Sequence, residues 1–521
     1  MLALPAPLKT AALRPALVAG ALAAVAARAG WRGADMPNLL FRIELFRRAG
    51  FTIWSSAWYG GHTTPGYSVL LAPLGAIAGP GLIGAASAVI AAVCFDLLLR
   101  TVPDVVRSRA GAASLLFAAG TVVNLAIGRL AFALGLALGL AALAARWRHR
   151  GLAVVLSVAT PLGSPVAGVF LLLAWLAVAI HSRHRRSAMA HALVLAAATL
   201  APLAVLGGAF PEAGRFPFRM AAWALTVAAC AAAYWLPRSL GPVRIGAGLY
   251  AVAATLTFVL ANPLGANVTR LGMFVLAPLL VATATLSRRA LALLIVPLLW
   301  WQWSPAVDAV VRSGRDPSTE KVYYQPLLDE LRRLGQPVGR IEIPLTLRHF
   351  EAAYVAPVVP IARGGERQLD IALNGLFYRD GPLTPAVYRR WLLDNGVRYV
   401  ALPDAPLDEA AEAEGELLTT GPSFLTPVWT GAHWRLWRVV GGDGMVDGPA
   451  RLVAQTPETV VLDASSPGDV VVRVHASALW SVEGAACVEA AGDEWVHLQV
   501  HAPGRLELHP VLVGSRVRCP D

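Results

Sequence analysis

Lysine is almost missing from this chain, and charged residues of every kind are scarce. Of 44 basic residues only Lys9 and Lys321 are lysines, and Asp, Glu, Lys and Arg together make up 15% of 521 residues, against roughly 25% in soluble domains. Hydrophobic residues reach 56%. No Lys/Arg-rich block is interleaved with aromatic residues, which argues against nucleic acid as a partner. This composition indicates an integral membrane protein.

Cysteine is also rare, with four in the whole chain. There is no CxxC motif and no Cys/His cluster, so the sequence gives no support to a divalent metal or any other cofactor. Cys94 and Cys230 lie in apolar runs, where cysteine usually acts as a small hydrophobic residue. Cys487 and Cys519 lie near the C-terminus and are expected to pair only if that part faces an oxidising compartment.

The apolar character is confined to the first part of the chain. We predict a transmembrane domain over residues 1–304, an extracytoplasmic α/β domain over 305–448 and a β-rich terminal module over 449–521. Eleven apolar runs are candidates for membrane spans: 12–29, 81–99, 111–127, 130–145, 151–162, 165–181, 189–207, 219–236, 245–262, 271–286 and 289–304.

The arginines predict which loops face the cytoplasm. Inner loops of multi-pass proteins collect basic residues, and a cytoplasmic N-terminus places the arginine clusters at 146–150, 183–186 and 288–289 inside. A twelfth apolar run spans residues 66–79. If it crossed the membrane, the arginine clusters at 146–150 and 183–186 would face outward. We therefore expect it to lie along the outer leaflet, within a first outer loop at 30–80. An odd number of spans then places the C-terminal part outside the plasma membrane.

The C-terminal part has the patterns of a soluble protein. Residues 318–335 have helical periodicity, 339–345 resemble a strand, and 383–396 predict a helix stopped at Gly396, followed by a buried strand at 397–404. From about residue 449, runs of alternating apolar residues such as DVVVRVHAS and EWVHLQVHA are separated by Pro and Gly turns. These runs predict a β-sandwich-like module.

The first outer loop holds an unusual amount of polar and aromatic chemistry. Residues 36–48 predict an interfacial amphipathic helix, with Leu39, Ile43 and Phe46 on its apolar face and Arg42 among its polar residues. Asp35, directly before it, is either a helix N-cap or a catalytic acid. Glu44 either pairs with Arg48 at i, i+4 or acts as a second acid.

Aromatic residues and a Gly-Gly-His turn follow this helix. Trp54, Trp58 and Tyr59 are typical of the aromatic belt at a membrane interface. His62, in the turn, is a weak candidate for substrate binding.

The order of these features resembles the start of the GT-C glycosyltransferase superfamily: an acid after the first span, an amphipathic helix, the WSSAWYGGH aromatics and turn, then PGYSVLLAPLGAI. The resemblance implies a GT-C-like helical membrane fold and transfer of a sugar from a polyprenyl-phosphate donor, at the outer face, to a glycan or lipid acceptor of the cell envelope. Asp35 is the implied catalytic residue, with Glu44 second. The family often has a paired acidic motif here, whereas Asp35 stands alone.

Such a transfer needs a carboxylate as general base and cations for the leaving phosphate. Arginines can hold a phosphate bidentately, and the candidates at outer span ends are Arg129, Arg215, Arg219 and Arg270. Asn267 accompanies Arg270 in a Gly-rich turn that opens a span, as at anion-binding helix N-termini.

In the C-terminal part, the segment ARGGERQLD is either a solvated loop or a polar rim that contacts the acceptor. Its candidate residues are Arg363, Glu366 and Arg367.

Two other functions fit the same sequence. A transporter or flippase usually has polar groups near the bilayer midplane and repeated halves, neither of which is evident. A non-catalytic scaffold of envelope assembly would bind glycan or lipid through the C-terminal part.

Overall fold

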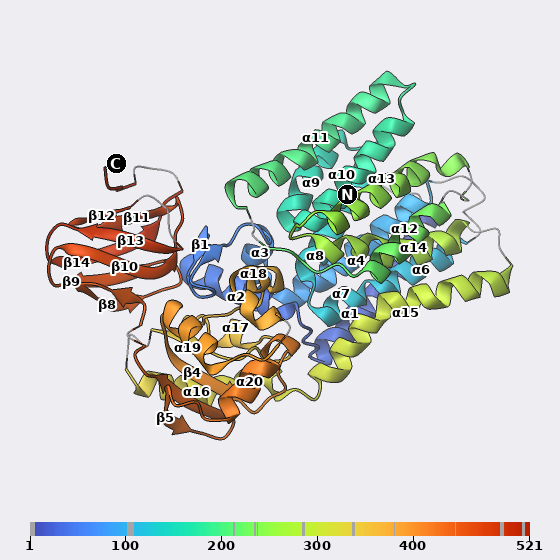
Figure 1. Ribbon diagram of the computed structural model, residues 1–521. Coiled ribbons are helices and arrows are strands. Elements are labelled where there is room, and N and C mark those ends of the chain that lie inside the picture. Colours follow the sequence, from blue (N-terminus) through green and yellow to red (C-terminus); the bar gives the residue numbers. More distant parts are fainter. Residues whose placement is uncertain are drawn as a thin grey trace. The chain divides into compact units, whose positions relative to one another are not determined.

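The computed structural model describes residues 6–101, 109–211, 214–233, 236, 238–283, 287–335, 339–379, 381–442, 444–489, 494–512 and 516–520 (Figure 1). The chain forms two compact units. The helical unit comprises residues 1–39 and 65–314. The C-terminal unit comprises residues 40–64 and 315–521.

The helical unit is built from apolar helices, as the composition predicts. They are α1 Ala6–Arg28, α3 Leu71–Ala78, α4 Pro80–Leu99, α6 Ala110–Gly120, α7 Val122–Ile127, α8 Leu130–Ala145, α9 Arg150–Gly163, α10 Pro165–His181, α11 Arg186–Ala209, α12 Met220–Ala232, α13 Gly241–Val259, α14 Arg270–Thr283 and α15 Arg288–Ser313, with short 3₁₀ turns η2 Arg238–Leu240 and η3 Gly265–Thr269.

Six helical stretches in the described residues are long and apolar enough to cross a membrane, and four further apolar helices are shorter. The six are Pro80–Leu99, Ala110–Ile127, Arg186–Ala209, Arg238–Val259, Gly265–Thr283 and Arg289–Ser313. The prediction of a mostly helical membrane protein is therefore confirmed at this level. Helix α3, in the run 66–79, has 8 residues, about 12 Å, which is too short for a hydrocarbon core of about 30 Å.

An ion pair inside the helical unit shows how it accommodates a charge. The buried carboxylate of Asp96 on α4 accepts hydrogen bonds from Arg100 Nε at 2.6 Å and Nη2 at 3.0 Å, and from Ser114 Oγ at 2.8 Å. Each carboxylate oxygen thus has a partner, which offsets the cost of burying the charge.

The first half of the C-terminal unit is an α/β arrangement. Its elements are η4 Pro317–Thr319, α16 Lys321–Arg333, β3 Arg340–Glu342, α17 Glu351–Tyr354, α18 Arg367–Leu373, η5 Gly375–Tyr378, α19 Pro385–Asp394, β4 Val397–Pro403, η6 Glu409–Ala411, α20 Glu412–Thr419, β5 Leu425–Thr430 and β6 Trp434–Val439. The sheet order is β3-β4-β6-β5, with β3 parallel to β4 and the other pairs antiparallel. Helix α19 stops at the predicted Gly396, whose φ of 63° is left-handed.

The second half contains two four-stranded sheets, drawn as red arrows in Figure 1. Their strands are β7 Val446–Asp447, β8 Ala450–Gln455, β9 Val460–Ala464, β10 Gly468–His475, β11 Trp480–Glu483, β12 Ala486–Val488, β13 Trp495–Val500 and β14 Gly504–Pro510. Sheet β12-β13-β10-β7 and sheet β11-β14-β9-β8 share one hydrophobic core, which includes Val472, Leu498 and Leu508. A disulfide joins Cys487 on β12 to Cys519.

The segment 40–64 folds as part of the C-terminal unit. Helix α2 Met36–Ala49 begins in the helical unit and continues in the C-terminal unit, and the two-stranded sheet of β1 Trp54–Ser55 and β2 His62–Thr63 follows. Trp58 Nε1 donates to Ala352 O at 3.2 Å, and Trp54 packs edge-on against Trp480.

The aromatic residues of this segment are buried. The expectation that Trp54, Trp58 and Tyr59 form an interfacial belt was therefore wrong, because these rings complete the core of a folded unit. Arg42 was expected on the polar face of the helix but is also buried, since it has an ion-pair partner within the same unit.

Candidate functional site

The position of Asp35 is set by a close approach of two backbone segments in the helical unit. Asp35 N donates to Ile127 O at 3.0 Å. A Cβ atom on Gly33 would lie 2.4 Å from the Ile127 backbone, and one on Gly128 would lie 2.5 Å from Met36 N. Gly128 also has a φ of 88°, which favours glycine. Both glycines are therefore needed for Asp35 to reach the loop before α8.

Two arginines predicted separately converge on the Asp35 carboxylate. Arg129, the N-cap of α8, places Nε 3.0 Å from Oδ2, and Arg270, the first residue of α14, places Nη2 3.7 Å from the same oxygen. The side chains are 34%, 19% and 16% exposed for Asp35, Arg129 and Arg270. The cluster is thus partly open to solvent, and it holds one carboxylate between two arginine guanidinium groups.

A large apolar cavity begins at Arg270. Its volume is about 420 Å³, and its walls come from α4, α8, α10, α12, α13, α14 and α15. The Arg270 guanidinium stands 5.5 Å from the centre of the Phe132 ring, and both residues line the cavity. Arg270 therefore belongs both to the charged cluster around Asp35 and to the wall of the apolar cavity.

The other predicted cations of the helical unit do not join this cluster. Arg215 and Arg219 are exposed on the segment before α12. Asn267 lies in the turn η3 before α14, and its backbone oxygen accepts the Arg270 N–H. Within the described part of the chain, Asp35 forms ion pairs with Arg129 and Arg270.

Glu44 and His62 lie in the C-terminal unit. Glu44 is half-exposed and accepts from Arg48 Nε at 2.7 Å, the i, i+4 pair that its spacing allows. His62 is buried and stacked on Trp58, with ring centres 5.3 Å apart. Burial, with the nearby Arg42 charge, lowers the pKa of His62 to about 3, so the ring is neutral near pH 7.

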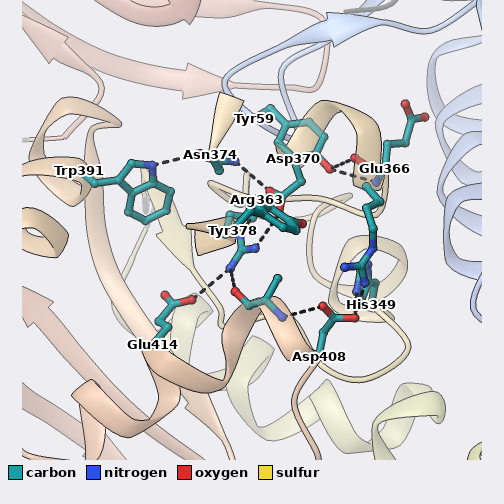
Figure 2. A network of polar contacts seen from close by, with 12 residues as sticks. Tyr59, His349, Arg363, Glu366, Asp370, Asn374, Tyr378, Trp391, Asp408 and Glu414 are labelled. Carbon is teal, nitrogen blue, oxygen red and sulfur yellow. Dashed lines mark hydrogen bonds and ion pairs between the residues drawn. The ribbon is translucent and has the colours of Figure 1, made fainter. Parts of the chain in front are cut away.

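Arg363, predicted in a loop or rim, is instead the centre of a buried network (Figure 2). Its Nη2 donates to Asp370 Oδ2 at 2.6 Å, and its Nη1 lies 3.3 Å from Glu414 Oε2. Tyr378 and Asn374 also donate to the Asp370 carboxylate. The exposed position expected for Arg363 was wrong, because the charge is neutralised within the fold.

The neighbouring candidates differ in exposure. Glu366 is buried and paired with Arg42, so its carboxylate is not part of an open rim. Arg367 is 34% exposed and pairs with Asp408, which His349 also approaches at 3.3 Å. Of the three predicted residues in this segment, Arg367 remains accessible to an acceptor.

Several buried acids of the C-terminal unit carry shifted pKa values. Burial and the neighbouring Glu414 carboxylate raise the pKa of Glu342 well above its ordinary value. Burial raises the pKa of Glu351 to about 7. Asp370 ends the ARGGERQLD segment but was not among its candidate residues, and Glu414 was not singled out, because no local pattern distinguishes it from the acids of an exposed helix.

Among the described residues, no group of three or more His, Cys, Asp or Glu side chains is arranged to hold a metal ion. A comparison with protein-family models, with curated proteins and with solved structures finds no match for this chain.

Proposed function

We propose that this protein is a membrane glycosyltransferase that takes a sugar from a polyprenyl-phosphate donor and transfers it to a cell-envelope acceptor. The observation that carries this proposal is the cluster of Asp35, Arg129 and Arg270 at the end of an apolar cavity. A polyprenyl phosphate has one anionic group and a long hydrocarbon chain. The cluster and the cavity match these two parts.

The residues have distinct parts in the proposed reaction. The donor phosphate draws Arg129 and Arg270 towards itself, which frees the Asp35 carboxylate to accept a proton. The acceptor oxygen forms a bond to the anomeric carbon while the bond from that carbon to the phosphate oxygen breaks. The acceptor proton moves to Asp35, and the two arginines stabilise the charge that develops on the leaving phosphate.

Two features support an outer location for the C-terminal unit and the first loop. Residues 40–64 and 315–521 form one compact unit, so both lie on the same side of a membrane, and residues 65–314 cross it an even number of times. Counting α6 and α7 as one and omitting α3, the described helices of that segment number ten. With α1 the count would equal the predicted eleven spans, and six of these stretches are long and apolar enough to cross a membrane. The Cys487–Cys519 disulfide favours an oxidising compartment.

The test is transfer by the purified full-length protein in liposomes. Synthetic polyprenyl-phosphate mannose and arabinose serve as donors, and a cell-envelope glycan extract serves as acceptor. Asp35→Asn should lower transfer at least about 100-fold, since a general base contributes 10²–10⁴-fold. Asp308→Asn is the control, because Asp308 sits in an exposed i, i+4 pair with Arg312 on α15.

Full transfer activity in Asp35→Asn would show that Asp35 is not the general base of the proposed reaction. Saturable passage of the donor across the liposome membrane, without transfer, would favour the flippase alternative instead.

A further inference from the structure

The cavity of the helical unit runs along one whole face of α8. The lining residues from this helix are Phe132, Gly135, Leu136, Gly139, Leu140 and Leu143, and Arg146, the residue that caps its C-terminal end, continues the row. Their spacings of three and four residues are those of a single helical face. The first and last are 14 positions apart, about 21 Å along the axis at 1.5 Å per residue. The cavity therefore has two distant ends, one at Arg270 and the other at Arg146.

The two arginines differ in their partners. Arg270 has the Asp35 carboxylate at 3.7 Å. Arg146 donates from Nη1 to the backbone oxygen of Leu143, and its buried Nε has no hydrogen-bond partner. Over the described residues, no carboxylate forms an ion pair with Arg146. A partly buried cation without a counter-charge is costly, as the fully bonded Asp96–Arg100 pair of the same unit illustrates.

The residues at the Arg146 end of the cavity indicate which class of ligand would fit there. The walls are almost entirely apolar, with leucine, alanine and valine side chains of α8, α10 and α13 around Arg146. A ligand that fits must bring a negative charge to the guanidinium and hydrocarbon to the walls. A phosphate accepts two parallel hydrogen bonds from arginine, and basic pockets between membrane helices are known settings for anionic head groups.

We propose that the Arg146 end of the cavity binds an anionic membrane phospholipid, with the phosphate on Arg146 and an acyl chain along the α8 face. The phosphate position is distinct from the one proposed for the sugar donor at Arg270 and Arg129, whereas the hydrocarbon parts of the two lipids would share the cavity. The inference does not depend on glycosyl transfer and would stand if the protein proved not to be an enzyme.

The experiment measures lipid binding to the purified full-length protein by native mass spectrometry. The probes are phosphatidylglycerol, phosphatidylcholine and undecaprenyl phosphate, each added from detergent. The wild type should bind phosphatidylglycerol at least about tenfold more tightly than phosphatidylcholine, and Arg146→Gln should remove that preference. Arg148→Gln is the matched control, because Arg148 has the same charge two residues away and is exposed.

A second variant keeps the test decisive if Arg146→Gln folds poorly. Leu143→Trp retains the arginine but fills the cavity beside it, and should weaken phosphatidylglycerol binding by a similar factor. Asp35→Asn should bind this lipid as the wild type does, which separates the site from the proposed reaction.

Three results would overturn the proposal: equal binding of the two phospholipids by the wild type, equal losses in Arg146→Gln and Arg148→Gln, or a loss in Arg146→Gln of undecaprenyl phosphate binding alone. The last would assign the arginine to the donor lipid.

Discussion

Arg42 and Glu366 form a buried ion pair between residues 324 positions apart in the sequence. Their side chains are 5% and 2% exposed. Arg42 Nη1 also donates to Thr64 O at 2.8 Å, and the Tyr59 hydroxyl bonds both the N–H and the C=O of Glu366. These bonds connect helix α2 and the Gly-Gly-His turn to the segment around residue 366 within one folded unit.

Breaking this pair should destabilise the C-terminal unit strongly. Glu366→Ala leaves the Arg42 charge buried without its counter-ion, and such losses cost about 3–5 kcal/mol. The change should appear as a lower midpoint of urea unfolding, followed by tryptophan fluorescence. Arg47→Gln, on the exposed side of the same helix, should cost less than about 1 kcal/mol. Equal effects of the two substitutions would show that the buried Arg42–Glu366 pair contributes no more to the unfolding free energy than an exposed ion pair does.

Deprotonation of Glu351 should lower the stability of the C-terminal unit as the pH rises from 5 to 8, while the buried His62 and the partly buried His475, whose pKa values are lowered to about 3 and about 4, act in the opposite direction below pH 6.5. Burial raises the pKa of Glu351 from its ordinary 4.5 to about 7, so the folded state keeps a proton that the unfolded chain releases. The contribution is complete below pH 4.5 and is lost as the pH passes through 7, on the order of 3 kcal/mol. Glu351→Gln should remove this contribution, so that the unfolding free energy decreases less, or increases more, as the pH rises over this range.

Glu342 and Glu414 contribute with the same sign, because their pKa values are also raised. Glu351→Gln therefore removes one of several contributions to the pH dependence. Glu483→Gln, at an exposed position, should leave the slope unchanged. A slope unaffected by Glu351→Gln would contradict the assignment of a buried, protonated Glu351.

The disulfide between Cys487 and Cys519 closes a segment of 32 residues. Cys487→Ser should lower the unfolding free energy of the C-terminal unit by about 2–5 kcal/mol. Peptide mapping without reduction should recover both cysteines in one linked fragment, while Cys94 and Cys230, which are free, react with an alkylating reagent after unfolding. Recovery of four alkylated cysteines would contradict the bond.

Gly128→Ala should disturb the Asp35 cluster without touching its charges. The added Cβ would meet the backbone of Met36, and the positive φ of residue 128 adds strain. We expect a loss of about 1–3 kcal/mol in stability and reduced transfer. Gly111→Ala, where an added Cβ meets open space, is the control. Unchanged stability and transfer in Gly128→Ala would show that the close approach is not needed.

Much of the architecture could be predicted because it rests on local patterns. The helices of the helical unit follow apolar runs, and β9, β10, β13 and β14 follow alternation of apolar residues. Asp35, Arg129 and Arg270 were each selected from their places at span ends, yet nothing in the sequence showed that the first would contact the other two. That contact depends on tertiary packing at Gly33 and Gly128.

The C-terminal unit was harder to anticipate for a related reason. The WSSAWY aromatics look the same in sequence whether they face lipid or a protein core, and only their partners, on residues 352–366 and at Trp480, decide between the two. Arg363 and Glu366 have the polarity of a loop but are buried, because Asp370, Glu414 and Arg42 neutralise them. Pairings over such separations leave no periodic signal.

The membership of residues 40–64 in the C-terminal unit also sets an order of events during synthesis. These residues leave the ribosome early, but their partners Ala352 and Glu366 are translated about three hundred residues later. Until then Trp58, Tyr59 and Arg42 have neither their hydrogen bonds nor their counter-ion. The segment therefore cannot complete its fold until the helical unit and residues 352–366 have been translated, so the last part of the chain to be made completes the folding of residues 40–64.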